Sequence, residues 1–385
     1  MLRVLGFLLV LPLLLLFVAG AHAYLLQRLV LDFGPPPGVA TLATGMVVVL
    51  ALLIVAAPIG ERLLPPRRHR FIAWPAAIWM GFGFLALMPL LLLEVVFAGF
   101  GIPAEPGSAA ARWRAGSVLG GALLLSAVAL RSGLAPPQLR RVSFEIERWP
   151  RALDGYRIVQ ITDIHIGPLL DRRFAVELVE RVNALTPDLV AVTGDLVDGP
   201  VRHLAPEVAP FAGLRGRDGV YFVTGNHDHL SHAPSWVPHI ESLGLRVLRN
   251  ERIEIGKDEA SFDLVGVDDY RADLVGGGAQ DLDAALAGRD PERAAVLLAH
   301  DPTTFKHARR RPIDLQISGH THGGQIWPFG AFVRLAVPWV SGIHRAGRAQ
   351  LYVSRGTGFW GPPMRLLAPA EITQIELRAK RDCNP

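Results

Sequence analysis

The sequence is poor in cysteine, in lysine and in charge. Its 385 residues include a single cysteine, Cys383, so no disulfide can form within the chain. The cysteine content therefore does not indicate whether the protein lies in an oxidising or a reducing compartment. Only three of the 39 basic residues are lysines, and no basic run is longer than the three arginines at 309–311. Because a nucleic-acid-binding face needs clustered basic residues, the sequence argues against a nucleic-acid partner.

The shortage of charge is confined to one part of the chain. Charged residues make up 19% of the sequence, whereas about a quarter is usual in soluble domains. Residues 1–130 contain 12 charged side chains, and residues 131–385 contain the other 62. The first third therefore has the composition of a membrane segment and the remainder that of a globular domain, which excludes a disordered, collagenous or coiled-coil chain.

Four uncharged stretches of the first third approach the length of about 20 apolar residues that an α-helix needs to cross a bilayer. They cover residues 4–27, 39–59, 71–93 and 115–130, and we expect residues 1–134 to form a transmembrane anchor. The first stretch also resembles a secretory signal peptide, with Ala21-His22-Ala23 as its cleavage site. We favour an uncleaved helix, because the apolar run continues past Ala23 and further spans follow it.

The arginines beside these stretches predict their orientation. If the loop between the second and third spans is cytoplasmic, eight arginines lie on the cytoplasmic side and three on the other. The N-terminus and the C-terminal domain then both face the cytoplasm. We further expect the interiors of the spans to lack ionisable side chains, with Glu94 marking the end of the third, which favours an anchor over a transporter.

The remainder of the chain alternates apolar strand-like runs with helical segments. Pro136-Pro137 closes the last span, residues 135–149 are expected to form a linker and a first strand, and residues 150–385 a single domain. A helix is expected over 174–185. Further strands are expected at 157–162, 189–193, 220–224, 262–265, 294–298, 315–318, 351–354 and 372–377. This mixture predicts an α/β domain with packed sheets.

Five blocks of histidine, aspartate and asparagine follow these strands. They are Asp163-Ile-His165, Gly194-Asp195-Leu-Val-Asp198, Gly225-Asn226-His227-Asp228, His300-Asp301 and Gly319-His320-Thr-His322. Open α/β sheets build their sites at the carboxyl ends of strands. The strand period of two should turn both polar side chains of D-x-H and of H-x-H to one face, and the glycines should permit tight turns.

The ordered set of blocks resembles the calcineurin-like metallophosphoesterase superfamily over roughly residues 140–385. Any one block by itself is weak evidence for this family, whereas all five blocks in this order are highly specific to it. The ending is similar to that of the bacterial membrane-associated branch, with Gly-His-Thr-His-Gly-Gly-Gln325, Ser354-Arg-Gly-Thr-Gly358 and Pro369-Ala-Glu371. The resemblance implies a calcineurin-like α/β fold, in which two packed mixed β-sheets are flanked by helices, and a bacterial inner-membrane location.

The resemblance also implies two divalent metal ions. One set of ligands would be Asp163, His165, Asp195 and His322, and the other Asp195 as the bridge with Asn226, His300 and His320. Carboxylate, imidazole and amide ligands without a thiolate suit manganese, iron or zinc. A metal-bridging hydroxide would attack phosphorus. His227 would stabilise the developing charge or protonate the leaving oxygen, and Asp198 would orient His227.

Other polar residues near these blocks have plainer interpretations. Asp228 either orients a ligand or caps a turn, and Asp301 is expected to belong to the turn before Pro302. His229 and His232 are either extra ligands or, as we expect, part of a solvated loop. Asp268-Asp269 either reach the site or, as we expect, lie in a surface loop. Arg355 and Arg365 either contact a phosphate or form salt bridges.

One difference from the motifs of the superfamily narrows the range of expected substrates. Ser/Thr protein phosphatases of the superfamily carry an arginine soon after the second aspartate of G-D-x-x-D, whereas Gly199-Pro200 follow Asp198 here. We therefore expect a membrane-anchored phosphoesterase acting on a phosphodiester, phosphomonoester or pyrophosphate of a lipid-linked or small molecule. The lipid bilayer is its expected partner, and the oligomeric state stays open. One alternative is a UDP-diacylglucosamine pyrophosphatase of lipid A synthesis, and another is a non-catalytic membrane scaffold or metal or phospholigand sensor.

Overall fold

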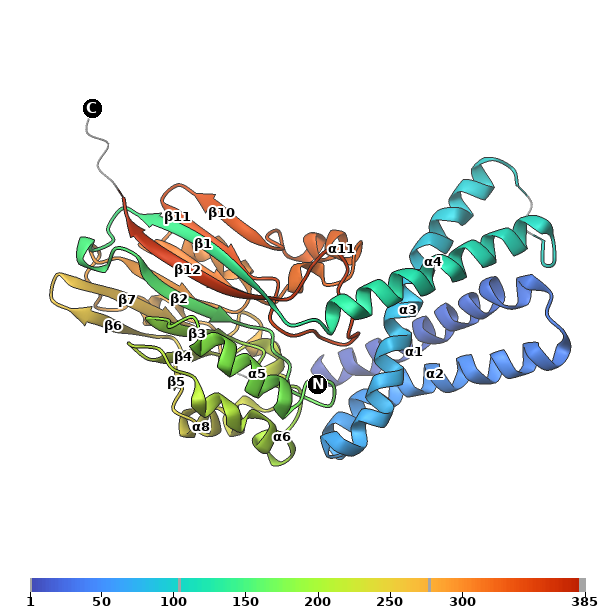
Figure 1. The fold of residues 1–385 in the computed structure, drawn as a ribbon, viewed down its shortest axis with the longest axis horizontal. Helices are drawn as coiled ribbons and strands as arrows, with labels where there is room; N and C mark the ends of the chain where they lie inside the picture. The colour runs from blue at the N-terminus through green and yellow to red at the C-terminus, as the bar shows by residue number, and fades with distance from the viewer. Residues whose placement is uncertain (1, 103–104, 276–277, 381–385) are drawn as a thin grey trace. The chain divides into compact units, whose positions relative to one another are not determined.

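The computed structural model describes residues 2–102, 105–275 and 278–380, which cluster into two compact units (Figure 1). The first unit comprises the chain up to Leu63, Arg67–Arg131 and the short segment Gly361–Met364. The second unit contains the rest of the described chain, including Ser132–Trp360.

Four long apolar helices form the first unit within the described residues, as the sequence predicts. They are α1 (Leu2–Leu29), α2 (Pro37–Leu63), α3 (Pro66–Gly99) and α4 (Ala109–Gly133). Proline starts α2 and α3, because its fixed φ suits the first helical position and its missing N–H is not needed there. Each helix is long enough to cross a bilayer, and α1, α3 and α4 share a small core around Leu25, Leu90 and Val118.

The helices also bury a group of charged side chains, so the expectation that the spans lack ionisable residues is wrong. Helix α4 begins six residues before the predicted stretch and therefore includes Arg114, whose side chain is fully buried. Arg114 pairs with the fully buried Asp32 and, at 3.1 Å, with Glu94, which also pairs with Arg28 at 3.0 Å. His22, inside α1, lies 2.8 Å from the indole nitrogen of Trp79. The two arginines and the two carboxylates compensate one another's charges. We call this ion-pair network of Arg28, Asp32, Glu94 and Arg114 the buried tie, because it links the helices.

The tie can be tested by removing Asp32. We expect Asp32→Ala to lower the thermal unfolding temperature of the detergent-solubilised chain strongly. It leaves Arg114 buried without its main partner, and breaking a buried pair in this way costs about 3–5 kcal/mol. Replacing the exposed Glu105 by Gln should change nothing, and Asp32→Ala combined with Arg114→Leu should recover part of the loss. An Asp32→Ala chain as stable as the Glu105→Gln chain would contradict the buried tie.

Two six-stranded sheets form the second unit within the described residues, which confirms the predicted α/β fold (Figure 1). The first sheet has the order β1-β12-β2-β3-β4-β5 and the second β10-β11-β9-β8-β7-β6. Their bounds are β1 Gln138–Ile146, β2 Tyr156–Ile161, β3 Leu189–Thr193, β4 Val220–Val223, β5 Arg246–Val247, β6 Glu251–Lys257, β7 Ala260–Gly266, β8 Ala295–Leu298, β9 Leu315–Ser318, β10 Gly342–Ala346, β11 Ala349–Val353 and β12 Glu371–Ala379.

The two sheets pack face to face and carry helices on their outer faces. Phe144 and Ile158 of the first sheet share a buried cluster with Phe262 and Ile317 of the second. The helices of this unit are α5 Arg172–Asn183, α6 Val201–Val208, α7 Asn226–Leu230, α8 Ala233–Ser242, α9 Leu282–Leu286, α10 Phe305–Ala308 and α11 Phe329–Ala336. Strand β3 is buried throughout because both faces of its sheet are covered, which explains its unbroken apolar sequence.

Parallel pairing brings the polar blocks to one edge of the double sheet. Strands β2, β3 and β4 run parallel in the first sheet, and β7, β8 and β9 run parallel in the second. The carboxyl ends of the two sheets are tied together, since the Gln160 amide donates to the Ser318 carbonyl at 3.0 Å and the His300 Nδ1 lies 2.8 Å from the Thr193 carbonyl. Loops that are far apart in the sequence therefore meet at this edge.

Candidate metal centre

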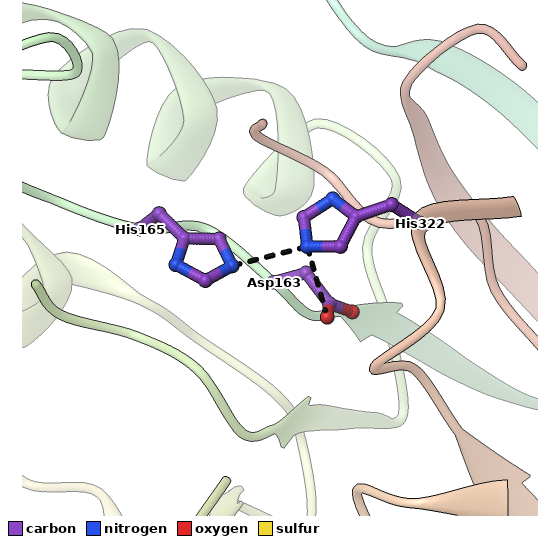
Figure 2. Close-up of side chains that lie close together, drawn as sticks. All are labelled: Asp163, His165 and His322. Atoms are coloured by element: carbon purple, nitrogen blue, oxygen red, sulfur yellow. Dashed lines mark hydrogen bonds and ion pairs between the residues drawn. The ribbon is translucent and has the colours of Figure 1, made fainter. Parts of the chain in front are cut away.

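Among the described residues, three overlapping groups of polar side chains at this edge have the spacing of a metal site, and one of them combines His165 and Asp195 with His227. Asp163, His165 and His322 form the first group. Figure 2 shows their side chains pointing toward one another, with Asp163 and His165 in the loop after β2 and His322 in the loop after β9. The Nε2 atoms of the two histidines are 3.1 Å apart, and the His322 Nε2 lies 3.4 Å from Asp163 Oδ1. All three side chains offer ligand atoms within 4.8 Å of one another, which is a suitable spacing for one cation.

Asp195, His300 and His320 form the second group, also with ligand atoms within 4.8 Å. Asp195 Oδ2 lies 3.1 Å from His300 Nε2 and 3.8 Å from His165 Nε2, so this carboxylate stands between the two groups. Burial would raise the pKa of Asp195, but the charges of His300, His227 and His165 hold it well below its usual range. Asp195 is therefore an ionised carboxylate at the point where the two groups meet.

The polar residues reach the site through a strained backbone, which the sequence analysis missed. Asp163, His165, Asp195, His320 and His322 all have φ between 51° and 73°. The prediction that strand alternation aligns D-x-H and H-x-H is wrong, because β2 and β9 have ended and these residues lie in left-handed loops. Non-glycine residues rarely adopt this conformation and persist in it only where the surrounding structure imposes it, typically at functional sites.

The glycines of the blocks provide space beside the carboxylates. A Cβ atom at Gly225 would overlap the carboxylate of Asp195, and one at Gly319 would overlap that of Asp163. Gly225 has an ordinary extended backbone, so the lack of a side chain matters there more than conformational freedom. The sequence analysis expected tight turns at these glycines, whereas at both positions the close approach of a carboxylate excludes any larger residue.

Asp198 connects His165 with His227. Its Oδ1 lies 3.1 Å from the His165 Nδ1 and 2.8 Å from the His227 Nδ1. Burial would raise the pKa of Asp198, but the two imidazoles hold it well below its usual range. Burial would lower the pKa of His227, yet the charges of Asp198 and Asp195 raise it to about 10. His227 is therefore a cationic imidazole beside both polar groups, and its side chain is partly exposed.

Asp228 holds the loop that carries Asp195. Its fully buried carboxylate accepts hydrogen bonds from the backbone N–H groups of Asp195, Leu196 and Gly225 at 2.8–2.9 Å. Burial and the charge of Asp195 raise the pKa of Asp228 to about 7. The sequence analysis left a choice between orienting a ligand and capping a turn. Asp228 does both, because Gly225 N–H begins the helix α7 and the other two donors belong to the Asp195 loop.

The expectation of a surface loop at Asp268-Asp269 is wrong. Asp268 is buried and accepts two hydrogen bonds from Arg249, each at 2.9 Å. Asp269 is buried as well, and burial raises its pKa to about 7. Its Oδ2 has no hydrogen-bond partner among the described residues. In the sequence, the position of this pair directly after the strand β7 was the feature that could have indicated its burial.

Arg365 holds the loop of His322 in place, and Asp301 lies near His320. Arg365 is fully buried and donates to the carbonyl groups of His322, Gly358 and Ala368, so neither a salt bridge nor an exposed phosphate contact describes it. Nothing in the sequence around Arg365 signals this role. Asp301 accepts from the Thr303 N–H at 2.7 Å, as the expected turn requires, and its Oδ2 also lies 3.8 Å from His320 Nε2.

The two histidines after His227 have separate surroundings. His232 is exposed, as expected, and its Nδ1 lies 2.7 Å from the hydroxyl of Ser235. His229 is buried instead of solvated, and its Nε2 lies 3.0 Å from the Thr224 hydroxyl. Within the described part of the chain, neither histidine belongs to a group that has the spacing of a metal site.

The donor set fits divalent cations. Asp163 Oδ2 and Asn226 Oδ1 are buried oxygens without a hydrogen-bond partner in the described chain. Buried polar atoms in proteins are nearly always satisfied, so an orphaned pair beside the two groups indicates a missing partner. Burial also lowers the pKa values of His320 and His322, which keeps both imidazoles neutral. Neutral imidazoles and anionic or amide oxygens are the ligand forms that manganese, iron and zinc accept.

The role of Asp228 can be tested through stability. We expect Asp228→Ala to lower the thermal unfolding temperature clearly, because it leaves three buried N–H donors without an acceptor at about 1–3 kcal/mol each. Asp228→Asn, which keeps one oxygen, should lie between Asp228→Ala and the unchanged chain.

Asp281 provides a matched control, since its carboxylate also accepts two backbone N–H bonds but caps the exposed helix α9. Asp281→Ala should cost only about 1 kcal/mol. Equal losses for Asp228→Ala and Asp281→Ala would show that Asp228 is an ordinary cap.

Comparison with known proteins gives a consistent picture. The family model described as calcineurin-like phosphoesterase matches residues 156–324. A Bos taurus transmembrane protein with metallophosphoesterase domain is 39% identical over 268 residues, covering 66% of this chain and 60% of that protein. A metallophosphoesterase of Helicobacter pylori is 36% identical, covering 64% and 66%. One of Aquifex aeolicus is 32% identical, covering 63% and 92%. The chain thus spans about 60% of the length of the Bos taurus relative.

Proposed function

Because this chain belongs to the calcineurin-like metallophosphoesterase family, we propose that it is a membrane-anchored hydrolase of phosphate esters with a site for two divalent cations. One observation carries the proposal. Asp195 is an ionised, buried carboxylate between two groups of metal-ligand spacing, and a cationic histidine lies beside them. Paired cations with a shared carboxylate and a nearby acid are suited to cleaving phosphate esters.

The chain offers seven ligand side chains for the two ions. Asp163, His165, Asp195 and His322 would hold one ion, and Asp195, Asn226, His300 and His320 the other. When bound, such ions bind phosphate oxygens and lower the pKa of a bound water. The identity of the metals, whether manganese, iron or zinc, stays a prediction.

His227 is proposed as the acid of the reaction. Asp198 accepts from its Nδ1 at 2.8 Å and keeps the ring cationic, which leaves the other ring nitrogen to donate to a phosphate oxygen or to the leaving group. The His227 side chain is partly exposed, as is that of the proposed ligand His320. A substrate is therefore able to reach His227 from solvent.

The surroundings of His227 favour a small or lipid-linked ester over a phosphoprotein. Gly199-Pro200 stand where protein phosphatases of the superfamily have an arginine. The indole of Trp360 lies edge-on to His227 instead, with ring centroids 5.4 Å apart. An apolar ring beside the acid suits an ester that carries an apolar group. Phosphodiesters, phosphomonoesters and pyrophosphates, including UDP-diacylglucosamine, are the candidates for a substrate screen.

Two substitutions separate metal binding from proton donation. We expect Asp195→Asn to lose both ions and activity together, because the proposed bridging charge is removed. His227→Asn should keep about two ions per chain and lose about 10²–10⁴-fold in turnover, the usual contribution of a positioned acid. The measurements are metal content by mass spectrometry and hydrolysis of the three ester classes with added manganese.

His232→Asn is the matched control, since His232 is an exposed histidine of the same segment outside both polar groups. It should keep both metal content and turnover. Unchanged turnover in both the Asp195→Asn and the His227→Asn chains would refute the proposal. A purified chain that holds almost no metal and hydrolyses none of the esters would favour the scaffold or sensor alternative.

We also propose that the second unit faces the cytoplasm of a bacterial inner membrane. The support is the asymmetry of the arginines at the ends of the predicted spans, eight against three. We expect an alkaline phosphatase fused to the C-terminus to be inactive, because that reporter folds only outside the cytoplasm, whereas a fluorescent reporter at the same position should be bright. The same phosphatase inserted between α3 and α4, after Pro106, should be active, and the opposite pattern would overturn this orientation.

A further inference from the structure

Helix α11 is an apolar helix that contributes nothing to the core. None of its eight residues, all of them described, is buried. Phe332 and Leu335 expose 49% and 87% of their surface, and the neighbouring Trp327 exposes 62%. Side chains of this size are normally buried in a soluble domain, and a contiguous exposed group of them marks an interaction surface.

The helix is fixed rigidly to the loop that carries His322. Gly324 and Gly330 touch backbone to backbone, so that a Cβ atom at Gly324 would overlap the backbone of Gly330. The Trp327 N–H donates to the Leu366 carbonyl at 3.1 Å, and the Leu366 N–H donates to the Gln325 carbonyl at 2.9 Å. Leu367, which is 78% exposed, is thereby held beside the start of α11.

The same connection reaches His227. The Gln325 side chain donates to the Trp360 carbonyl at 2.9 Å and accepts from the Trp360 N–H at 3.0 Å. Trp360 in turn lies against His227. One continuous piece of structure therefore joins the exposed apolar helix to the proposed acid of the site.

The charge of this region selects the kind of surface that it fits. Residues 315–370 contain five arginines and no aspartate or glutamate. Arg334 lies on α11 itself and is exposed. Arg345 and Arg348 lie at the β10–β11 turn, at the other end of these strands, where Arg348 pairs with Glu147 at 4.0 Å. Apolar side chains with arginines beside them are typical of helices that lie in the interface of an anionic bilayer. A basic or neutral protein partner would find no acidic group in this segment.

The chain supplies such a bilayer at close range. Only residues 134–137 separate α4 from β1, and four residues span at most about 14 Å. The second unit is therefore tethered close to the membrane that the apolar helices of the first unit are long enough to cross. Tethering raises the effective concentration of the bilayer at the domain, so that a small exposed apolar surface suffices for binding.

We propose that α11, Trp327 and Leu367 form a docking surface that inserts into the interface of an anionic phospholipid bilayer, and that the site acts on phosphate esters embedded in that bilayer. The docking stands on the exposed side chains, on Arg334 in a segment without acidic residues, and on the tether. The choice of substrate rests on the proposed phosphoesterase function and on the link from Gln325 through Trp360 to His227.

Lipid-quenching fluorescence of the full chain in nanodiscs tests the docking. Cys383→Ser removes the single native cysteine, and Leu335→Cys or Glu259→Cys then provides one site for an environment-sensitive dye. Glu259 is exposed in the turn between β6 and β7, at the end of β7 opposite to the site. With brominated phosphatidylglycerol in the disc, we expect dye at position 335 to lose about half of its fluorescence, since interfacial helices reach the acyl boundary. Dye at position 259 should be unaffected.

Variants of the docking surface sharpen the result. Phe332→Glu and, independently, Leu367→Glu should abolish the quenching at position 335 without lowering the thermal unfolding temperature, because both side chains are exposed. Val176→Glu, at an exposed apolar position on α5, should leave the quenching intact. Replacing phosphatidylglycerol by brominated phosphatidylcholine should weaken it. Absent quenching at position 335, or equal quenching at positions 335 and 259, would overturn the docking.

Hydrolysis tests the substrate. The measured quantity is the ratio of the turnover of a phosphodiester embedded in the disc to the turnover of a soluble phosphodiester. The unchanged chain and Val176→Glu give its reference value. Phe332→Glu should lower this ratio about tenfold through lost access to the interface. An unchanged ratio would overturn the choice of substrate while docking stands. A chain that cleaves neither ester would overturn the substrate and the proposed function together, whereas the quenching decides the docking by itself.

Discussion

The buried negative charge of Asp195 is the constraint on which the rest of the site depends. A carboxylate out of water is stable only with compensating partners, and here three residues provide them: His300 at 3.1 Å, the backbone N–H of His227 at 2.8 Å, and the charge of His165. Its backbone is held by Asp228. The ends of both sheets must meet for this to occur, because Asp195 follows β3 while its partners lie in the segments after β2, β4 and β8.

The convergence of loops from both sheets on Asp195 explains why the surrounding backbone is strained. Five of the proposed ligand residues are left-handed, and two glycines leave room for carboxylates. Strain of about 1–3 kcal/mol per residue persists only where packing imposes it. The two flanking sheets supply that packing through a shared apolar core. The same rigidity extends through Gln325 to Trp360 and α11, which gives the proposed docking surface a fixed relation to His227.

Sequence patterns predicted the α/β fold and the four apolar helices, because unbroken apolar runs and their bounding prolines depend on local physics. They failed where a role arises between distant residues. Asp269 and Arg365 appear as ordinary loop residues in the sequence, yet the structure buries both. Likewise, Arg114 is an unremarkable arginine near the predicted end of a span. Only the earlier start of α4 and the partner Asp32, 82 residues away, reveal the buried pair.

The sequence by itself determined which residue types follow which strands, and hence the family and the chemistry that we propose. Those blocks are local features of the sequence, and their order along the chain does not depend on how the chain packs. Tertiary structure alone decided which atoms meet, which carboxylates lose water and which apolar helix stays uncovered. These outcomes depend on long-range contacts, such as the bond between Gln160 and Ser318 that ties one sheet to the other. Burial and charge compensation arise only when the sheets close on each other, because no short segment can desolvate its own polar groups.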